Sequence, residues 1–473
     1  MSRPQHFGWF LSRGFGPHGW GHPYHDWDYT WHRPELYQQS VRALEQAGFD
    51  LVIIEDALSL GNADTLDLRI RSAYGGPKHD PLLLAPYLFD VTQHIGIAPT
   101  VNPLAYSPYQ AARQFATLQH LSDYRFGINV VTDVGSSRHF GVEPLDHDGA
   151  YDRAEEWLGA VQRLWHSWGP DALVADAATG HFADGSKLDA LHHRGAHYSF
   201  DGPLNALPFP TLPSRDHLLA SRQNPPYSGD SVVDFGESRG GEGSSGDPIV
   251  VSPGGSPRGL AFAGTNSQVQ LALASLDIET VRAYRAKVLE SAAAHGRTAA
   301  DIDILFVFKP IITASREEAD RVVEASAHPS DADLLVIAAG QSSDLETDLT
   351  GLDLDKPIDP AIFGDHVSRG SIKGLLGRFD SFADATLREI LTAKARLGRI
   401  STRSGYVGTA EEIADFIQEL GDDADNDGFI FSGDLHPVTI HRMLDELVPI
   451  LRRRGILRRS YGDGGLRGNL RDF

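Results

Sequence analysis

The sequence predicts an α/β protein built as a (β/α)8 barrel, with insertions at the carboxyl-terminal ends of its strands. Short apolar runs alternate with longer segments of helical periodicity along most of the chain. About eight of these runs are apolar throughout, as expected for parallel strands that are buried on both faces. Helices separate the runs, which favours a closed barrel over the alternative fold, a doubly wound open sheet.

Composition limits the class of protein. The chain has 473 residues, 41% of them hydrophobic, and is expected to form a single barrel domain over 1–473. The absence of cysteine excludes disulfides and thiolate metal sites. The net charge of -22 argues against nucleic acid and anionic membranes as partners. No apolar run reaches the roughly 18 residues of a membrane span, and the start lacks the layout of a signal peptide, so a cytoplasmic protein is expected.

Four strand–helix pairs are predicted in the amino-terminal half. The strands follow from continuous apolar runs and the helices from apolar residues at helical spacing, with Pro34 and Gly48 bounding the first helix. The predicted strands cover residues 6–12, 50–57, 94–102 and 126–133. The predicted helices cover residues 34–49, 80–92, 107–122 and 150–168.

The carboxyl-terminal half continues the alternation with two interruptions. Residues 211–247 are rich in Gly and Ser and are expected to form a mobile lid rather than a folded domain. Residues 327–400, with polar turns and short helices, form a second insertion region. The predicted strands cover residues 248–254, 269–275, 301–313 and 427–433. The predicted helices cover residues 256–266, 278–296, 315–327, 409–421 and 441–455.

Polar residues gather where the predicted strands end, which is where a parallel barrel carries its chemistry. Asp56 follows the second strand, and Thr100 and Asn102 end the third. The fourth strand contains Asn129 and ends in Asp133. These side chains are therefore candidates for an active site.

The fifth strand runs into "SPGGSPRG" directly before a helix. Gly254 and Gly255 allow a tight turn, and Ser256 begins the helix, an arrangement that binds phosphate through backbone N–H groups. The alternative is an ordinary serine N-cap. His147 and Tyr151 share one helix face, and by themselves they are consistent with a cap and a packing residue.

The first 36 residues crowd together four of the seven tryptophans and five histidines. Three explanations are open: a metal site at His18, His22 and His25, a packed segment with surface histidines, or one wall of a ligand pocket.

Seven segments carry a family resemblance: "HDPLLLAPYLFDVTQHIGIAPTVNPLAYSPYQAARQFATLQHLSDYRFGINVVTDV", "HDGAYDRAEEWLGAVQRLWHSW", "HRGAHYSFDGPLN", "GGSPRGLAFAG", "YVGTAEEIADFI", "NDGFIF" and "VPILRRRGILRRSYGDGGLRGNL". They resemble the flavin-dependent monooxygenase family of the bacterial-luciferase-like superfamily, which includes nitrilotriacetate, dibenzothiophene-sulfone and long-chain alkane monooxygenases. The resemblance covers nearly the whole chain except 211–247 and much of 327–400.

The resemblance implies a (β/α)8 barrel that forms a homodimer or homotetramer. It implies that a separate NAD(P)H-dependent flavin reductase supplies reduced FMN. The flavin reacts with O2, and the resulting hydroperoxide inserts one oxygen atom into a small organic substrate. No metal is required, because the cofactor carries the oxygen chemistry.

The resemblance also assigns residues. Asp56 and Thr100 match positions beside the flavin ring, and Asn129 and His147 match positions that line the same cavity. The resemblance implies that Tyr151, Gly255 and Ser256 bind the FMN phosphate. Asp133 stands where the family usually has serine, and because a carboxylate repels phosphate it receives no phosphate role.

The end of the first strand lies over the flavin in this family. His18, Trp20 and His22 are therefore expected to form a catalytic wall of the substrate pocket, with Trp supplying apolar surface and His moving protons. Two other functions stay open, a deazaflavin (F420)-dependent dehydrogenase of the same superfamily and a non-catalytic flavin-binding paralogue.

We expect His18 to stabilise the reacting oxygen or to move a proton. In His18→Ala, affinity for reduced FMN should stay near normal, while turnover falls by more than tenfold and H2O2 release rises, since this role is worth roughly 10²–10⁴ in rate. Binding and turnover are measured separately. Normal coupled turnover would leave His18 as a packing residue, and stoichiometric metal that is lost in the variant would favour the metal site.

Overall fold

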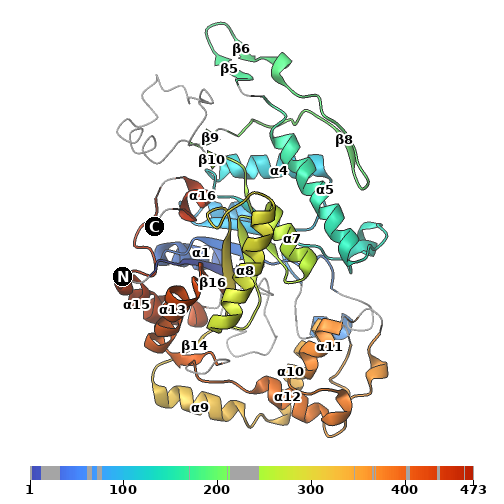
Figure 1. Ribbon diagram of the computed structural model, residues 1–473, viewed down its shortest axis with the longest axis vertical. Coiled ribbons are helices and arrows are strands. Elements are labelled where there is room, and N and C mark those ends of the chain that lie inside the picture. Colours follow the sequence, from blue (N-terminus) through green and yellow to red (C-terminus); the bar gives the residue numbers. More distant parts are fainter. Residues whose placement is uncertain are drawn as a thin grey trace.

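The chain forms a closed barrel of eight parallel strands surrounded by helices (Figure 1). The computed structural model describes residues 3–11, 32–60, 66–71, 77–169, 171–209, 211–212, 244–345, 347–364, 367, 369–400, 405–433, 437–462 and 464–471. The strand order is β1-β16-β13-β12-β11-β4-β3-β2, and β1 pairs with both β2 and β16. The predicted barrel is confirmed and the open sheet is wrong, because the sheet closes on itself.

Each barrel strand predicted from the sequence is present. The strands are β1 (His6–Leu11), β2 (Leu51–Ile54), β3 (Gly96–Val101), β4 (Gly127–Val130), β11 (Ile249–Pro253), β12 (Val269–Ala272), β13 (Asp303–Phe308) and β16 (Gly428–Gly433). The helices around the barrel are α1 (Glu35–Ala47), α3 (Pro81–Phe89), α4 (Pro108–Leu121), α5 (His147–Trp165), α7 (Pro257–Asn266), α8 (Ile278–Ala294), α13 (Ala410–Ala424), α14 (Pro437–Arg442) and α15 (Val448–Arg454). The short helix α2 (Leu66–Arg71) contacts α10 (Asp331–Leu345) instead. None of the helices in these described ranges is long and apolar enough to cross a membrane.

Two predicted elements are divided in the structure. The strand expected over 301–313 is two strands, β13 and β14 (Ile311–Thr313), and β14 pairs with β15 (Val407–Thr409) outside the barrel. Pro310 lies between them and has no N–H for a strand ladder. The helix expected over 441–455 contains a π-helical turn, Met443–Leu447, just before Pro449. A proline removes a helix hydrogen bond, which favours such local irregularities.

Two β-hairpins that the sequence did not predict follow α5. They pair β5 (Leu173–Asp176) with β6 (His181–Ala183), and β7 (His192–Arg194) with β8 (Ser199–Asp201). Their strands are short and half exposed, so they lack the apolar runs that reveal a buried strand. In Figure 1 both extend away from the barrel beside α5.

The expected lid over 211–247 lies largely outside the described residues and stays a prediction. Its two roots pair as β9 (Thr211–Leu212) and β10 (Ser244–Ser245). Next to them, the Gln119 amide donates to the carbonyl oxygen of Gly246 at 2.7 Å, and His166 lies 2.9 Å from the Asp247 carboxylate. Gln119 and His166 mark the last turns of α4 and α5, so the roots lie at the amino-terminal end of the barrel. Connections from helix to strand lie at that end by topology.

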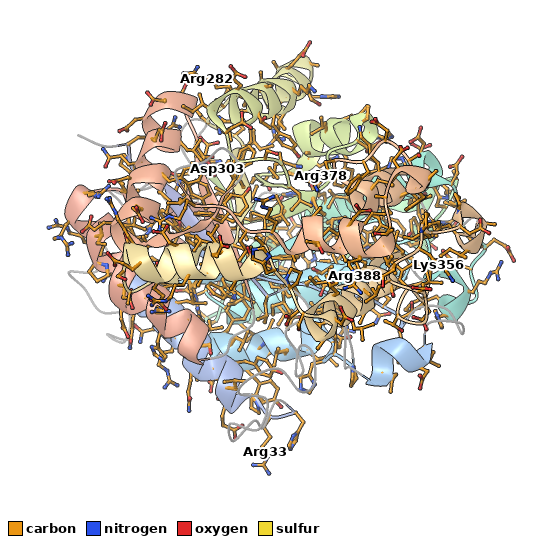
Figure 2. The ribbon with its side chains drawn as sticks, turned by 90° about the horizontal axis from the view of Figure 1, so that it is seen from below. Arg33, Arg282, Asp303, Lys356, Arg378 and Arg388 are labelled. Atoms are coloured by element: carbon orange, nitrogen blue, oxygen red, sulfur yellow. The ribbon has the colours of Figure 1, made fainter. Side chains whose placement is uncertain are left out.

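The insertion region 327–400 folds into helices with an apolar core of its own. Its helices are α10 (Asp331–Leu345), α11 (Arg369–Leu376) and α12 (Leu387–Ala395), which lie below the barrel in Figure 1. The buried side chains of this core come from all three helices and the turns between them: Leu334, Ala338, Leu345, Leu349, Ile358, Leu375, Phe382, Ala385, Leu387, Ile390 and Leu391. Lys356 and Arg388, labelled in Figure 2, belong to its surface.

Side chains fill the barrel interior, and a short helix closes its amino-terminal end. The interior cluster contains apolar residues from six strands, Leu51, Ile53, Ala98, Ile249, Val251, Val269, Leu271, Leu305 and Ile430, and Phe10 of β1 packs against them. Leu466 and Leu470, from α16 (Gly465–Asn469) and the residue after it, complete this cluster. A Cβ at Gly96 would collide with Leu466. A ligand can therefore approach the interior only from the carboxyl-terminal ends of the strands.

A buried ion cluster joins the chain ends to the barrel. The carboxylate of Asp50 is fully buried, accepts the N–H of Phe7 at 2.9 Å and lies 2.6 Å from the Arg458 guanidinium. The His6 imidazole lies 3.3 Å from the same carboxylate. Burial lowers the pKa of His6, but the charge of Asp50, the hydrogen bond to it and the charge of Asp303 together outweigh burial, so the net shift is upward. The cluster thus links β1, β2 and the carboxyl-terminal segment.

We expect Arg458→Met to destabilise the fold by about 3–5 kcal/mol, because it leaves the Asp50 carboxylate buried without its counter-charge. The matched control is Arg388→Met, whose partners Asp331 and Asp355 are exposed, and which should leave stability close to the wild-type value. The free energy of unfolding in urea measures both. Equal losses in the two variants would contradict this account of the cluster, and adding Asp50→Asn to Arg458→Met should recover part of the loss.

Candidate functional site

Two polar residues face the barrel interior at the carboxyl ends of neighbouring strands. Thr100 on β3 and Asn129 on β4 are register partners, and they lie two residues after Ala98 and Gly127, on the same interior face. The Asn129 amide donates to Thr100 Oγ1 at 2.8 Å. Its oxygen, Oδ1, is buried and has no hydrogen-bond partner among the described residues. Because a buried acceptor without a donor is costly, this oxygen indicates a ligand that donates an N–H or O–H.

Asp56 follows β2 at the same rim. Burial raises its pKa to about 6, with the neighbouring carboxylates of Glu55 and Asp80 adding to the shift and the Lys78 ammonium opposing it. Lys78 itself contacts the Glu55 carboxylate. A carboxyl group that titrates near pH 6 can hold or release a proton close to neutral pH, which suits general acid–base chemistry.

The amino-terminal ends of α5 and α7 meet at the same rim. His147, the first residue of α5, places Nε2 3.3 Å from Ser256 Oγ, and Ser256 caps α7 by accepting the N–H of Gly259 at 3.0 Å. One turn along α5, the Tyr151 ring lies 5.2 Å from the His147 ring. A Cβ added at Gly254 would come within 2.9 Å of the Tyr151 hydroxyl. Two helix dipoles therefore direct their positive ends at one place, which suits an anion.

Arg258 does not supply a free positive charge to the site where the amino-terminal ends of α5 and α7 meet. Its guanidinium bonds to the carboxylates of Glu155, at 2.8 Å, and Asp152, at 2.7 Å. Its charge is already neutralised, so an anion here depends on backbone N–H groups, hydroxyls and the His147 imidazole. That agrees with a chain whose net charge is strongly negative.

Asp133 is used within its own loop. Its Oδ1 accepts the N–H of Ser136 at 3.2 Å, and its Oδ2 lies 2.5 Å from Ser136 Oγ. The side chain of Asn102 donates to the backbone carbonyl of Asp133 at 3.3 Å. These contacts give Asp133 a structural role at the end of β4.

The described candidates lie on four strands that are consecutive in the barrel, β2, β3, β4 and β11, or at the starts of the helices α5 and α7. Asp56, Thr100 and Asn129 come from the first three strands, and Gly255 and Ser256 follow β11. Three residues beside these candidates were not predicted from the sequence: Lys78, which contacts Glu55, and Gln270 and Tyr284, which both donate to the carbonyl oxygen of Gly254. Gln270 had a signal, because it is a polar residue inside an otherwise apolar predicted strand.

His18, Trp20 and His22 lie in 12–31, outside the described residues, so their role stays a prediction. The same holds for a metal site at His18, His22 and His25. Within the described ranges, no group of three or more His, Asp or Glu side chains is arranged to hold a metal ion.

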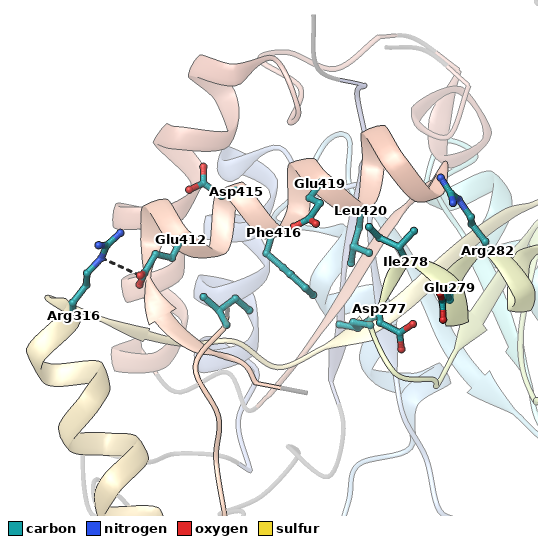
Figure 3. A pocket seen from close by; sticks show the side chains of 12 residues that line it. Asp277, Ile278, Glu279, Arg282, Arg316, Glu412, Asp415, Phe416, Glu419 and Leu420 are labelled. Carbon is teal, nitrogen blue, oxygen red and sulfur yellow. Dashed lines mark ion pairs between the residues drawn. The ribbon is translucent and has the colours of Figure 1, made fainter. Parts of the chain in front are cut away.

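A groove of about 660 Å³ lies in the outer helical layer between α8 and α13 (Figure 3). It is lined by Leu276, Asp277, Ile278, Glu279, Arg282, Arg316, Ile400, Glu412, Asp415, Phe416, Glu419 and Leu420. Arg316 is paired with Glu412 at 3.0 Å. Five carboxylates against two arginines disfavour a phosphate, so the rim of the barrel, not this groove, is the place for an anionic cofactor.

A closed parallel barrel with a Gly-Gly-Ser turn between its fifth strand and the next helix is the architecture of (β/α)8 enzymes, many of which bind phosphorylated ligands at the carboxyl rim. The profile of the family described as "Luciferase-like monooxygenase" matches residues 6–424. The chain belongs to this family, and it is a flavin-dependent monooxygenase. The family resemblance noted in the sequence is thereby confirmed, and the monooxygenase function is favoured over the deazaflavin-dependent dehydrogenase.

Two curated relatives match almost end to end. The dibenzothiophene-sulfone monooxygenase of Rhodococcus erythropolis (strain XP) is 31% identical, covering 99% of this chain and 97% of its own length. The N-acetyl-S-(2-succino)cysteine monooxygenase of Bacillus subtilis (strain 168) is 30% identical, covering 97% and 95%. The solved structure of a riboflavin lyase with modified FMN and substrate riboflavin superposes with a TM-score of 0.76 at 26% identity, covering 100% of this chain and 96% of that one.

We expect the Asp56 carboxyl to make stability depend on pH with a defined sign. Its pKa is about 6 in the folded protein and about 4 when unfolded, so the folded state binds more protons between these values. Wild type should therefore gain stability relative to Asp56→Asn as the pH falls from 7 to 4.5, by about 1–2 kcal/mol after allowing for partial exposure. Unfolding free energies at several pH values measure the difference, and parallel curves for the two proteins would contradict the shift.

Proposed function

We propose that this chain is the oxygenase component of a two-component system. It binds reduced FMN at the rim formed by β2, β3, β4 and β11, and a separate flavin reductase supplies that cofactor. The observation that carries the proposal is the meeting of the α5 and α7 amino-terminal ends at His147, Tyr151 and Ser256. The homodimeric or homotetrameric state and the cytoplasmic location stay predictions.

The residues at the rim fit this cofactor. Gly254 has a φ of 126°, in the left-handed region, and a side chain there would meet the Tyr151 hydroxyl. Only glycine fits this tight turn, because a side chain there would collide with the Tyr151 hydroxyl. The buried Oδ1 of Asn129 can accept an N–H from the flavin ring. The riboflavin lyase structure, which contains modified FMN, supports the same cofactor.

Reduced FMN, when bound, supplies two electrons for splitting O2, so that one oxygen atom enters the substrate and the other leaves as water. The protein binds and orients it: Ser256 Oγ, the Tyr151 hydroxyl and the His147 imidazole hold the phosphate. Thr100 holds the Asn129 amide so that its oxygen faces the ligand. Asp56, whose carboxyl pKa is raised to about 6, can take up or release a proton close to neutral pH. The packed barrel interior excludes water from below.

We propose an organic sulfur compound as the substrate. Both curated relatives named above act on such compounds according to their names. The test supplies a generic flavin reductase, NADH and a panel of sulfones and thioethers, each paired with the hydrocarbon of the same shape. Oxygenated product from the sulfur compound, with less from its hydrocarbon pair, is expected. Equal turnover of both members, or of hydrocarbons alone, would overturn the sulfur preference but leave the monooxygenase.

We expect Ser256→Ala and Tyr151→Phe each to weaken reduced-FMN binding about ten- to a hundredfold, because each removes one hydrogen bond to a charged phosphate. Anaerobic titration with reduced FMN measures the dissociation constants. Thr265→Ala is the control, since Thr265 lies on the same helix, is exposed and bonds only within it to Ala261. Unchanged affinity in both test variants would remove the phosphate from this turn.

A further inference from the structure

The carbonyl oxygen of Gly254, at the start of the phosphate-binding turn, is held by two side chains from outside the turn. The Gln270 amide on β12 donates to it at 2.9 Å, and the Tyr284 hydroxyl on α8 donates at 3.3 Å. The same Gln270 amide group also donates to the Tyr284 hydroxyl at 3.1 Å. The three groups form a closed set of hydrogen bonds.

A hydrogen bond from Ser252 holds the Gln270 side chain in place. It is fully buried, and its Oε1 accepts the hydroxyl of Ser252 at 3.2 Å. Ser252 in turn lies 2.7 Å from the hydroxyl of Ser267. Buried polar groups are costly unless they are bonded, and a fully bonded network permits few other arrangements. The Gln270 amide is therefore a rigid donor at the back of the turn.

Tyr284 is fixed by packing. Its ring stands edge-on to the Phe306 ring at 5.5 Å, and it also lies beside Gly255, where an added Cβ would be 3.9 Å away. Burial raises the pKa of Tyr284, so its hydroxyl keeps its proton and remains a donor at neutral pH.

We call the hydrogen bonds from Gln270 and Tyr284 to the Gly254 carbonyl oxygen the clamp. Because the peptide bond is planar, the clamp also fixes the direction of the next N–H group. In a trans peptide the carbonyl oxygen and the following N–H point in opposite directions. Holding the Gly254 oxygen toward the helical layer therefore turns the N–H of Gly255 the other way, toward the exposed side of the turn. Ser256 Oγ, one residue further along this turn, lies 3.3 Å from Nε2 of His147.

We propose that Gln270 and Tyr284 are positioning residues for the flavin phosphate. They hold the Gly254–Gly255 peptide so that its N–H donates to a phosphate oxygen, without touching the cofactor themselves. The inference rests on the proposed function and adds two residues to that same site. Without the clamp, the glycine pair can rotate this peptide at little cost, and the N–H is no longer preorganised.

The test compares two reduced flavins that differ in the phosphate alone, FMN and riboflavin. The double variant Gln270→Met/Tyr284→Phe should lose about tenfold of the preference for reduced FMN over reduced riboflavin, with riboflavin affinity unchanged. A merely structural role would weaken both flavins together. Tyr461→Phe is the matched control, because it removes a buried hydroxyl that donates to the carbonyl oxygens of Glu45 and Phe49 at the other end of the barrel. It should keep the preference.

Ser256→Ala separates this inference from the proposed site. If Ser256→Ala and Tyr151→Phe both leave the preference for FMN unchanged, the phosphate does not bind at this turn, and the proposed phosphate site and the positioning role fail together. If Ser256→Ala lowers the preference and the double variant does not, the positioning role alone is overturned. Should Gln270→Met not fold, Tyr284→Phe by itself must lower the preference, and an unchanged value for that variant overturns the proposal.

Discussion

Closure of the barrel by β1 is the constraint on which the rest of the molecule depends. β1 pairs with β2 on one side and with β16 on the other, so the first and last barrel strands of the chain are neighbours. The buried Asp50–Arg458 pair secures this closure from the amino-terminal end, and it brings the carboxyl-terminal segment against the barrel. Because the strands are all parallel, their carboxyl ends share one rim, and four neighbouring strands bring the candidate residues together there.

The two ends of the barrel divide stability from chemistry. The amino-terminal end is sealed by Leu466 and Leu470 and holds the buried ion cluster. The carboxyl-terminal end has a buried oxygen at Asn129 that no described residue satisfies, a carboxyl group at Asp56 with a raised pKa, and two helix amino-terminal ends. Groups that would be costly in a sealed core are concentrated where a ligand can satisfy them. A protein of net charge -22 can thus bind an anionic cofactor with local dipoles instead of excess cations.

The barrel and the turn after its fifth strand could both be predicted from the sequence alone. Apolar runs without alternation identify strands that are buried on both faces, and helical spacing identifies the layer outside, so the barrel followed from local periodicity. The Gly-Gly-Ser turn before a helix indicated the anion site, and the family resemblance added His147 and Tyr151 to it. These signals are local, since each depends on residues within one strand, one turn or one helix.

Tertiary structure decided what depends on contacts between distant segments. The clamp of Gln270 and Tyr284 on Gly254 joins a strand, a helix and a turn, and no spacing along the chain reports it. The splitting of 301–313 depends on the pairing of β14 with β15, almost a hundred residues later. The spacing of apolar residues shows which side chains are buried, because each buried position of a strand or helix requires an apolar residue of its own. Which buried groups meet, and with what hydrogen bonds, is set only when the barrel closes and brings its eight strands into register.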